Sequence, residues 1–279
     1  MTKDAVHLLN GKLVKESELV IPVRDLGFLR GYAVFDFLIT YKRRPFMFEK
    51  HIDRLFNSAK LIGLSIPWSK EQIRNLVLKT LAANSDGEEK AIKIIVSGGV
   101  SDSLIPKGKS TIIILVDPRH VYSKDHFEKG VGVITVQHQR YSPEAKTNNY
   151  IEGVRQVQVA AKSRAIEPIY YNDKQVFEGA TCNIFAVIQG KLLTPKSNLL
   201  LGITRDTLLK HFKSPVPMKV ADFSRSELGR ATEVFLTASN KEVMPVTRID
   251  GKKVGKGEVG PVTKEAIRQF TAFTTSNRW

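Results

Sequence analysis

A lysine at a junction between a loop and a helix is the first residue of this chain whose setting could support chemistry. Lys146 begins the run Lys-Thr-Asn-Asn-Tyr, directly before a helix expected to start near Tyr150. A lysine amine becomes a nucleophile or a base only where burial or neighbouring positive charge lowers its pKa. Taken alone, such a lysine is most often a solvated surface residue, so the other motifs decide how it is interpreted.

Two stretches downstream of Lys146 add a carboxylate and a candidate anion site. Glu178 opens the sequence Glu-Gly-Ala-Thr-Cys-Asn, and Gly202 lies in Leu-Leu-Gly-Ile-Thr-Arg. A helix is expected to begin after Gly202, so the backbone N–H groups of Ile203 and Thr204 can bind an anion at its positive end. Simple capping of that helix by Thr204 is the alternative interpretation.

Other motifs do not support a nucleotide-binding site or a metal site. The run Gly255–Gly260 matches the dinucleotide-binding fingerprint, but too few residues follow it for the βαβ unit of about 30 residues that this fingerprint needs. It is interpreted as a glycine-rich turn. Gly108–Ser110 lacks the earlier glycine of a phosphate-binding P-loop and is interpreted as the entry to a strand. None of the six histidines forms a pair at helical spacing, so the sequence predicts no metal site.

Taken in order, the motifs resemble the class IV (fold-type IV) pyridoxal-phosphate aminotransferases over nearly the whole chain. They lie in Arg24–Asp36, His51–Leu55, Lys146–Tyr150, Val176–Asn183, Leu200–Arg205 and Gly260–Thr263. That family includes D-amino-acid aminotransferases, branched-chain aminotransferases, R-selective amine transaminases and aminodeoxychorismate lyase. The resemblance implies a two-domain α+β fold, with a small N-terminal α/β domain and a larger C-terminal domain on a mixed, barrel-like sheet. It also implies pyridoxal 5'-phosphate as cofactor and a homodimer whose active site lies between the domains.

The resemblance assigns the chemistry at the cofactor ring to Lys146, Glu178, Tyr150 and Leu200. Lys146 aligns with the lysine that forms the Schiff base and then moves the proton between the substrate Cα and the cofactor carbon. Glu178 aligns with the carboxylate that keeps the pyridine nitrogen protonated; a surface glutamate at a strand end is the alternative. Tyr150 resembles the tyrosine that hydrogen-bonds the phenolic oxygen, and Leu200 would pack against the ring. Both are alternatively residues of the core.

The same resemblance assigns the phosphate to Arg54, Ile203, Thr204 and Ser239. The planar guanidinium of Arg54 suits a phosphate better than a lysine would, although a solvated arginine on an amphipathic helix is the alternative. Ser239 aligns with a hydroxyl residue that is usually threonine in the family.

The substrate class depends on groups that bind a carboxylate, and here the chain departs from two patterns of the family. Ile92–Gly99 contains neither the Arg-x-His pair of well-studied bacterial D-amino-acid enzymes nor the Tyr-x-Arg-Pro segment of branched-chain enzymes. Leu29–Tyr32 and Lys93 resemble a less usual D-amino-acid aminotransferase subgroup, with Arg30 and Lys93 as carboxylate partners. Structural ion pairs are the alternative. The prediction is a ping-pong transaminase for D-amino acids and 2-oxo acids, ahead of an L-branched-chain aminotransferase and, third, aminodeoxychorismate lyase.

Composition limits the remaining classes. The 279 residues are 42% hydrophobic and 25% charged, as in an ordinary folded protein. The single cysteine, Cys182, excludes an internal disulfide and a Cys-rich zinc site and favours a reducing compartment. A net charge of +15 raises a nucleic-acid-binding protein as an alternative, but the basic residues are scattered and no aromatic and basic strip accompanies them. Without an apolar segment of about 18 residues, the expected location is the cytoplasm.

The elements that must position these residues follow from hydrophobic periodicity and turn residues. A hairpin is expected around Asn10-Gly11 and another at Asp250-Gly251. Helices are expected over Glu49–Leu64, Lys70–Ala83, Tyr150–Ala165, Thr204–Phe212 and Val262–Phe273. Strands are expected over Ala91–Ser97, Thr111–Val116, Val131–Val136, Ile169–Tyr171, Ile184–Ile188, Leu192–Thr194 and Glu233–Thr237, and at Phe177. A polar, proline-containing stretch predicts a linker at 118–124 between domains over 1–117 and 125–279.

Overall fold

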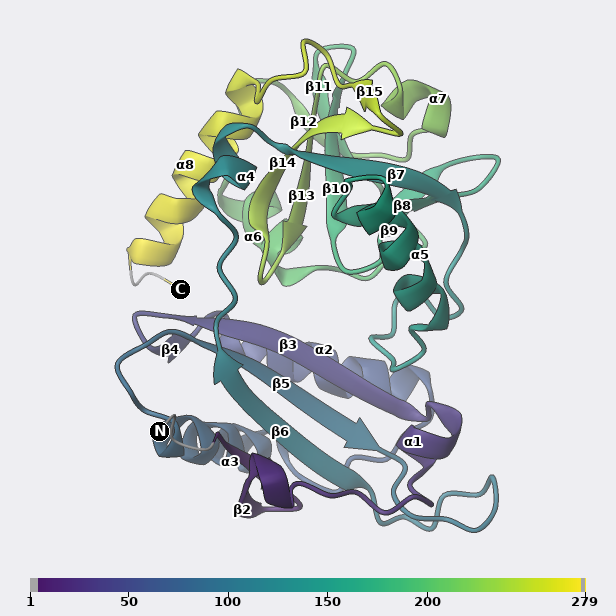
Figure 1. The fold of residues 1–279 in the computed structure, drawn as a ribbon, viewed down its shortest axis with the longest axis vertical. Coiled ribbons are helices and arrows are strands. Elements are labelled where there is room, and N and C mark those ends of the chain that lie inside the picture. Colours follow the sequence, from purple (N-terminus) through teal and green to yellow (C-terminus); the bar gives the residue numbers. More distant parts are fainter. Residues whose placement is uncertain (1–4, 277–278) are drawn as a thin grey trace. The chain divides into compact units, whose positions relative to one another are not determined.

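The computed structural model describes residues 5–276 and 279, and its contacts divide the chain into two compact units (Figure 1). The first unit contains the chain up to His120 together with Ala145–Asn149. The second unit contains Val121–Glu144 and the chain from Tyr150 onward. The segment that carries Lys146 therefore belongs to the first unit, although the chain on either side of it belongs to the second.

The first unit is built on an antiparallel sheet (Figure 1). Its strands in spatial order are β2 (Lys12–Lys15), β1 (Val6–Leu9), β6 (Thr111–Pro118), β5 (Lys90–Ser97), β3 (Ala33–Tyr41) and β4 (Arg44–Pro45). The first predicted hairpin is confirmed, because Asn10 and Gly11 take the left-handed conformation of a tight turn, with φ of 49° and 84°. The short helices η1 (Glu16–Glu18) and α1 (Leu26–Arg30) connect β2 to β3.

Helices α2 (Phe48–Leu61) and α3 (Lys70–Ala83) cover one face of this sheet (Figure 1). Alternate residues of β5, namely Ile92, Ile94 and Val96, are fully buried in the core that these helices share with the sheet. The helix α3 has the predicted bounds. It begins after Ser69, which exchanges side-chain and backbone hydrogen bonds with Gln72 in a capping box.

The second unit is built on a mixed sheet that curls like part of a barrel (Figure 1). Its strands in order are β12 (Met218–Val220), β11 (Lys191–Thr194), β10 (Asn183–Ile188), β13 (Glu233–Ala238), β14 (Glu242–Ile249), β7 (Val131–Gln137), β8 (Glu167–Tyr171) and β9 (Val176–Gly179), with β15 (Lys252–Lys253) beside β14. The parallel strands β7 and β8 are joined through helix α5 (Ile151–Lys162). A loop of three residues leads from β9 into β10, so β9 also contacts β10.

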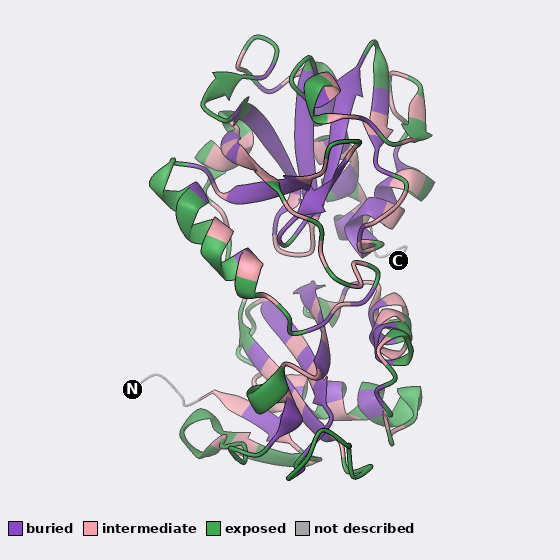
Figure 2. Cartoon of the chain, turned by 90° about the vertical axis from the view of Figure 1, so that its right-hand side faces the viewer, coloured by how far each residue is buried: buried purple, intermediate pink, exposed green. Residues whose placement is uncertain are grey.

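Helices α4 (Lys124–Glu128), α6 (Ile203–His211), α7 (Arg225–Leu228) and α8 (Pro261–Thr275) pack around that sheet. Figure 2 shows that the buried residues concentrate on the strands, whereas exposed residues occupy outer helix faces and loops. The glycine-rich run Gly255–Gly260 forms a turn before α8, with positive φ at Gly255 and Gly257, as predicted. None of the described helices combines the length and the apolar character that a membrane span needs.

Most predicted elements are confirmed within a few residues. The strand β3 and the short elements η1, α1, β4, α4, β12 and α7 were not predicted, and of β14 only the end at the Asp250-Gly251 hairpin was predicted. β3 lies between β5 and the short edge strand β4. Its apolar sequence Ala33–Tyr41, interrupted only by Asp36 and Thr40, lacks the regular alternation of apolar and polar residues that identifies a strand. β14 contains Pro245, which usually argues against a central strand. The structure accommodates it because the pairing of β14 with β7 begins only at Val246, so the missing N–H leaves no gap in that ladder.

Candidate active site

Lys146 lies at an edge of the first unit's sheet, where its backbone is fixed on two sides. Its carbonyl accepts a hydrogen bond from Phe35 N–H at 2.9 Å, and its N–H donates to Ser58 Oγ at 3.1 Å. Asn148 N–H donates to the carbonyl of Ala33 at 3.1 Å, so the segment runs beside the start of β3. The Lys146 ammonium lies 4.3 Å from the centre of the Phe35 ring. Backbone hydrogen bonds thus fix the main-chain position from which the Lys146 side chain extends.

Arg54 belongs to a buried cluster with Asp36 and His51. Arg54 Nε and Nη2 donate to the two Asp36 carboxylate oxygens, each at 2.8 Å, and His51 Nδ1 lies 2.6 Å from Asp36 Oδ1. His51, Arg54 and Ser58 are spaced three and four residues apart, so one face of α2 carries all three. This bidentate pair fixes the plane of the guanidinium.

The charges of this cluster follow from its burial. Desolvation alone would raise the pKa of Asp36, but Arg54 and then His51 outweigh it and hold that pKa well below its usual range. Burial lowers the pKa of His51, even though Asp36 favours its charged form, and the Lys146 ammonium lowers it further. His51 is therefore neutral at neutral pH, and its Nδ1–H donates to the ionised Asp36.

Glu178 is almost fully buried in the second unit, at the end of β9. Its Oε1 accepts from Arg140 Nη1 at 2.8 Å. Its Oε2 accepts from the backbone N–H of Leu200 at 3.0 Å and from Asn183 Nδ2 at 3.4 Å. Asn183 Nδ2 also donates to the carbonyl of Leu200 at 2.8 Å. Both carboxylate oxygens therefore accept hydrogen bonds from the protein. Glu178 is not the solvated surface glutamate of the alternative interpretation.

Arg140 was not predicted as a site residue, yet it is the cation of this cluster. Burial would lower the pKa of Arg140, but Glu178 and the nearby phenols of Tyr150 and Tyr170 raise it. Tyr150 is the residue directly before α5 and is half-buried. The structure therefore brings Tyr150 close to the Arg140 and Glu178 pair within the second unit.

The first turn of α6 is a candidate anion cradle. The N-cap residue Gly202 supplies no side chain, and a Cβ atom there would collide with Asn183 Oδ1. Ile203 and Thr204 are buried at the start of the helix. Asn183 pairs across the sheet with Thr237, whose hydroxyl is buried and has no hydrogen-bond partner among the described residues.

Such a cradle fits a phosphate group. Helix N–H groups at Ile203 and Thr204 and the unpaired Thr237 hydroxyl are all donors to an anion. Ser239 follows two residues after Thr237, just beyond the end of β13, and is half-buried.

The two predicted carboxylate partners lie apart on the first unit. Arg30 is exposed at the end of α1, whose Gly27 packs against Ser97 at the end of β5. Lys93 is half-buried four residues before Ser97, about 13 Å along the strand. In register, Lys93 lies beside Phe37, on the same sheet face as Phe35 and opposite the face that packs on α2 and α3.

A family comparison identifies the class of protein. The family model described as "Amino-transferase class IV" matches residues 33–249, which is most of the chain. The chain belongs to the class IV aminotransferases. In sequence, this aminotransferase is 34% identical over 280 residues to a protein of Methanocaldococcus jannaschii provisionally named branched-chain-amino-acid aminotransferase, covering 96% of each. It is 32% identical to a D-alanine aminotransferase of Listeria monocytogenes, covering 94% of each.

Solved structures agree with this assignment. The branched-chain amino acid aminotransferase of Escherichia coli has a TM-score of 0.90 and 26% identity, covering 99% of this chain and 98% of the other. A second branched-chain amino acid aminotransferase, solved with pyridoxamine 5'-phosphate, also has a TM-score of 0.90 and 26% identity, covering 100% of this chain and 96% of the other. The predicted fold class and cofactor are confirmed: this is a pyridoxal-phosphate-dependent aminotransferase whose substrates are amino acids and 2-oxo acids.

The aminotransferase also contains site neighbours that the sequence reasoning missed. They are Asp36, His51, Arg140, Asn183 and Thr237. For Asp36 a signal existed, because a carboxylate inside the apolar run Ala33–Ile39 is expected to be buried, and a buried carboxylate requires a cation. Arg140 carried no comparable signal, since its partner Glu178 lies 38 residues away.

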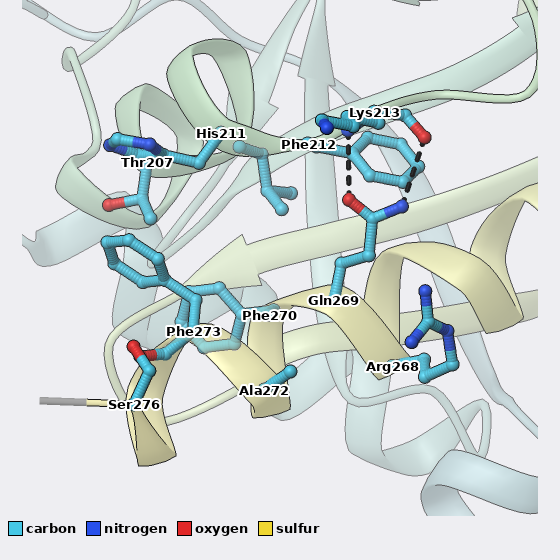
Figure 3. Close-up of a pocket in the computed structure, with 11 residues that line it drawn as sticks. Thr207, His211, Phe212, Lys213, Arg268, Gln269, Phe270, Ala272, Phe273 and Ser276 are labelled. Atoms are coloured by element: carbon cyan, nitrogen blue, oxygen red, sulfur yellow. Dashed lines mark hydrogen bonds between the residues drawn. The ribbon is translucent and has the colours of Figure 1, made fainter. Parts of the chain in front are cut away.

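A separate groove of about 390 Å³ lies between α6 and α8 of the aminotransferase (Figure 3). Gln269 and Lys213 exchange hydrogen bonds across it at 2.9 and 3.0 Å, and His211 stacks near Phe273. It is lined by the second half of α6, whereas Gly202 and Thr204 lie at the other end of that helix. Among the described residues, no three His, Cys, Asp or Glu side chains gather to hold a metal ion.

Proposed function

We propose that this aminotransferase transfers the amino group of a D-amino acid to a 2-oxo acid. The observation that carries the proposal is that Lys93 lies on the same sheet face as Phe35, the ring beneath the Lys146 ammonium. A cation on that face can pair with the carboxylate of an amino acid that reacts at Lys146. The preference for the D-isomer is supported by the resemblance of Leu29–Tyr32 and Lys93 to a less usual D-amino-acid aminotransferase subgroup and by the D-alanine aminotransferases among the relatives.

The proposal gives each residue at the cofactor ring a role. Pyridoxal phosphate, when bound, supplies the electron sink. Lys146 holds the cofactor through its amine and carries the proton to and from the substrate Cα. Glu178, held in place by Arg140 and Leu200 N–H, faces the pyridine nitrogen and keeps it protonated. Tyr150 donates to the phenolic oxygen, and Leu200 packs against the ring.

The cofactor phosphate is assigned to side-chain donors and to backbone N–H donors. Arg54, with its plane set by Asp36, contributes charge. Ile203 and Thr204 contribute backbone N–H groups at the positive end of α6. Ser239 contributes a hydroxyl, and the unpaired Thr237 hydroxyl joins it.

Preference for an L-branched-chain amino acid is the second candidate. The solved structures most similar to this chain include branched-chain aminotransferases, at 25–27% identity. Arg30 is exposed and Lys93 is a point charge, so neither alone fixes which face of a substrate reacts. Aminodeoxychorismate lyase activity stays third.

A second copy of the chain is the proposed partner. An apolar patch is exposed on the first unit where two segments run side by side, joined by a hydrogen bond of 3.2 Å from Ser101 N–H to Arg24 O. Its members are Val20, Ile21, Val23, Phe28, Leu29, Val100, Leu104 and Ile105. Apolar patches of this kind mark interaction surfaces. We expect the wild-type chain to sediment as a dimer and the double variant F28S/L104S to sediment as a monomer. If both sediment alike, this patch is not the dimer interface.

The cytoplasmic location, expected because the sequence has no long apolar segment, stays a prediction alongside this proposal. So does the division into a small domain over 1–117 and a cofactor-binding domain over 125–279, with the linker 118–124. The structure adds that Ala145–Asn149 belongs with the first unit.

The proposal is tested by the visible absorbance of the holoenzyme before and after addition of D-alanine and, separately, L-leucine. Loss of the visible band with D-alanine alone supports it, and loss with L-leucine alone promotes the second candidate. For the attachment site, Lys146→Ala should retain no cofactor after borohydride reduction and denaturation. Retention of a reduced cofactor by that variant overturns the role of Lys146.

A further inference from the structure

A buried ion pair in the second unit joins the turn between β13 and β14 to the start of β8. Lys241 Nζ lies 3.1 Å from Glu167 Oε2 and donates to Thr181 Oγ1 at 2.7 Å. The side chains of Lys241 and Glu167 are 4% and 2% exposed, so water solvates neither charge. Burial alone would lower the pKa of Lys241, but the attraction of Glu167 outweighs it and raises that pKa, so the ammonium stays charged.

The Glu167 carboxylate holds the turn that follows Glu178. Its Oε1 accepts the backbone N–H of Thr181 at 2.5 Å, and both oxygens lie 3.1 Å from the Thr181 hydroxyl. At Gly179, a Cβ atom would lie 2.5 Å from Cys182 Sγ, 2.9 Å from Glu167 Cγ and 3.0 Å from Glu167 Oε1, so a side chain there would displace the turn from the carboxylate. The turn is therefore shaped around Glu167.

Cys182, in the same turn, adds no charge to this cluster. Burial, together with the neighbouring Glu167, raises the pKa of the Cys182 thiol well above its usual value. The charged groups that meet in the cluster are those of Glu167 and Lys241.

Lys241 comes from a different turn, the one between β13 and β14. That turn also carries Ser239, and it starts two residues after Thr237. Glu242, next to Lys241, has a φ of 53°, which non-glycine residues seldom adopt. Lys241 thus ties the turn that carries Ser239 to the turn that directly follows Glu178.

We propose that Lys241 is a positioning residue which, through Glu167 and Thr181, fixes Glu178 relative to Ser239. The inference rests on the proposed roles of those two residues at opposite ends of the cofactor. Charge-assisted hydrogen bonds are short and directional, and in a buried setting water does not compete for them. Side chains that bind a cofactor keep their geometry only when the residues behind them are themselves held.

The test removes both charges at once, because deleting one alone would leave the other buried and unpaired. The variant is Lys241→Met with Glu167→Gln, loaded with pyridoxal phosphate labelled with ¹⁵N in the ring. The ¹⁵N chemical shift reports whether the ring nitrogen is protonated. We expect full protonation in the wild type, an unprotonated fraction in the double variant, and a cofactor Kd raised about tenfold or more.

Glu233→Gln is the matched control. Glu233 is a buried carboxylate of the same unit that accepts N–H groups of Val262 and Thr263 at the start of α8, at 3.2 and 2.8 Å. Its loss should lower the Tm of the apoprotein and leave the ¹⁵N signal unchanged. A double variant with the wild-type signal and Kd overturns the proposal, and so does an equal loss of protonation in the control.

Two further variants separate a failure of the role of Lys241 from a failure of the proposed function. Thr181→Val removes only the hydroxyl between Lys241 and Glu167, and should shift the signal and Kd in the same direction by a smaller amount; no change contradicts the proposal. Glu178→Gln tests the proposed function itself. If its ring nitrogen stays protonated, the role of Glu178 fails; if protonation is lost there but not in the double variant, only the role of Lys241 fails.

Discussion

Arg54 and Asp36 form two parallel hydrogen bonds of 2.8 Å, with the carboxylate fully buried on β3 and the guanidinium on α2. This pair orients Arg54, which is predicted to bind the cofactor phosphate. It also neutralises the charge of Asp36 inside the core of the first unit. Loss of Asp36 would leave the partly buried Arg54 cation without that partner.

We therefore expect Asp36→Asn to lower the free energy of unfolding by about 3 kcal/mol. Asp53→Asn on the same helix is the control, because Asp53 pairs with Lys70 at 61% and 55% exposure and should contribute at most about 1 kcal/mol. Urea unfolding of the apoproteins measures both. A loss for Asp36→Asn no larger than that of the control would show that the pair contributes little.

His51 should make the stability of the protein fall in mild acid. Its folded pKa is lowered, chiefly by burial, so between that value and about 6.5 the unfolded chain binds a proton that the folded chain does not. The free energy of unfolding should decrease by at most about 1.4 kcal/mol per pH unit below pH 6.5. Asp36, whose pKa is also lowered, adds to this only below about pH 4.

Urea unfolding between about pH 7.5 and 5 measures the slope. His51→Gln keeps a donor toward Asp36 but does not titrate, so the part of the slope due to His51 should vanish in that variant. An unchanged slope would assign the acid sensitivity to other groups.

Thr237 should affect apoprotein and holoenzyme in opposite directions. Its hydroxyl is buried with no partner among the described residues, so Thr237→Val should stabilise the apoprotein by about 1 kcal/mol. The same change removes a proposed phosphate donor and should raise the Kd for pyridoxal phosphate. Thr207→Val is the control, because that hydroxyl already donates to the carbonyl of Ile203 at 2.9 Å. If the Thr237→Val apoprotein is less stable than the wild type and the Kd for pyridoxal phosphate is unchanged, Thr237 is not a phosphate donor.

Gly202 should tolerate no side chain. In Gly202→Ala the new methyl group would collide with Asn183 Oδ1, and Asn183 in turn contacts Glu178. We expect the cofactor Kd to rise about tenfold, since both the helix start and the carboxylate shift. Gly229→Ala in the same unit is the control, because its Cβ would meet only ordinary contacts of 3.5 Å or more. Equal cofactor affinity in the two variants would contradict the cradle.

The sequence predicted most of what local pattern controls. The helices α2 and α3 carry clear apolar stripes, and turn residues such as Asn10-Gly11 specify their own backbone. The order of the motifs, through a family resemblance, predicts Lys146, Arg54 and Glu178 as site residues, and their roles stay predictions.

Long-range partners could not be predicted in the same way. Arg140 meets Glu178 across 38 residues, and Asp36 meets Arg54 only because β3 and α2 pack together. β3 itself was missed because residues of both its faces are mostly apolar in type, so its sequence shows no regular alternation of apolar and polar residues. Pairing between distant charges depends on the packing of whole elements, which a single sequence does not reveal.

The pairing of Ala145–Asn149 with β3 limits how the protein can be divided. A fragment ending at His120 would lack this segment, so Phe35 N–H and the Ala33 carbonyl would lose their backbone partners. An uncovered strand edge is a template for pairing with other chains, so such a fragment is expected to aggregate. The first unit is therefore not a separable module that evolution or an engineer could graft elsewhere. Its sheet is completed only after the ribosome has added the lysine on which the chemistry is proposed to depend.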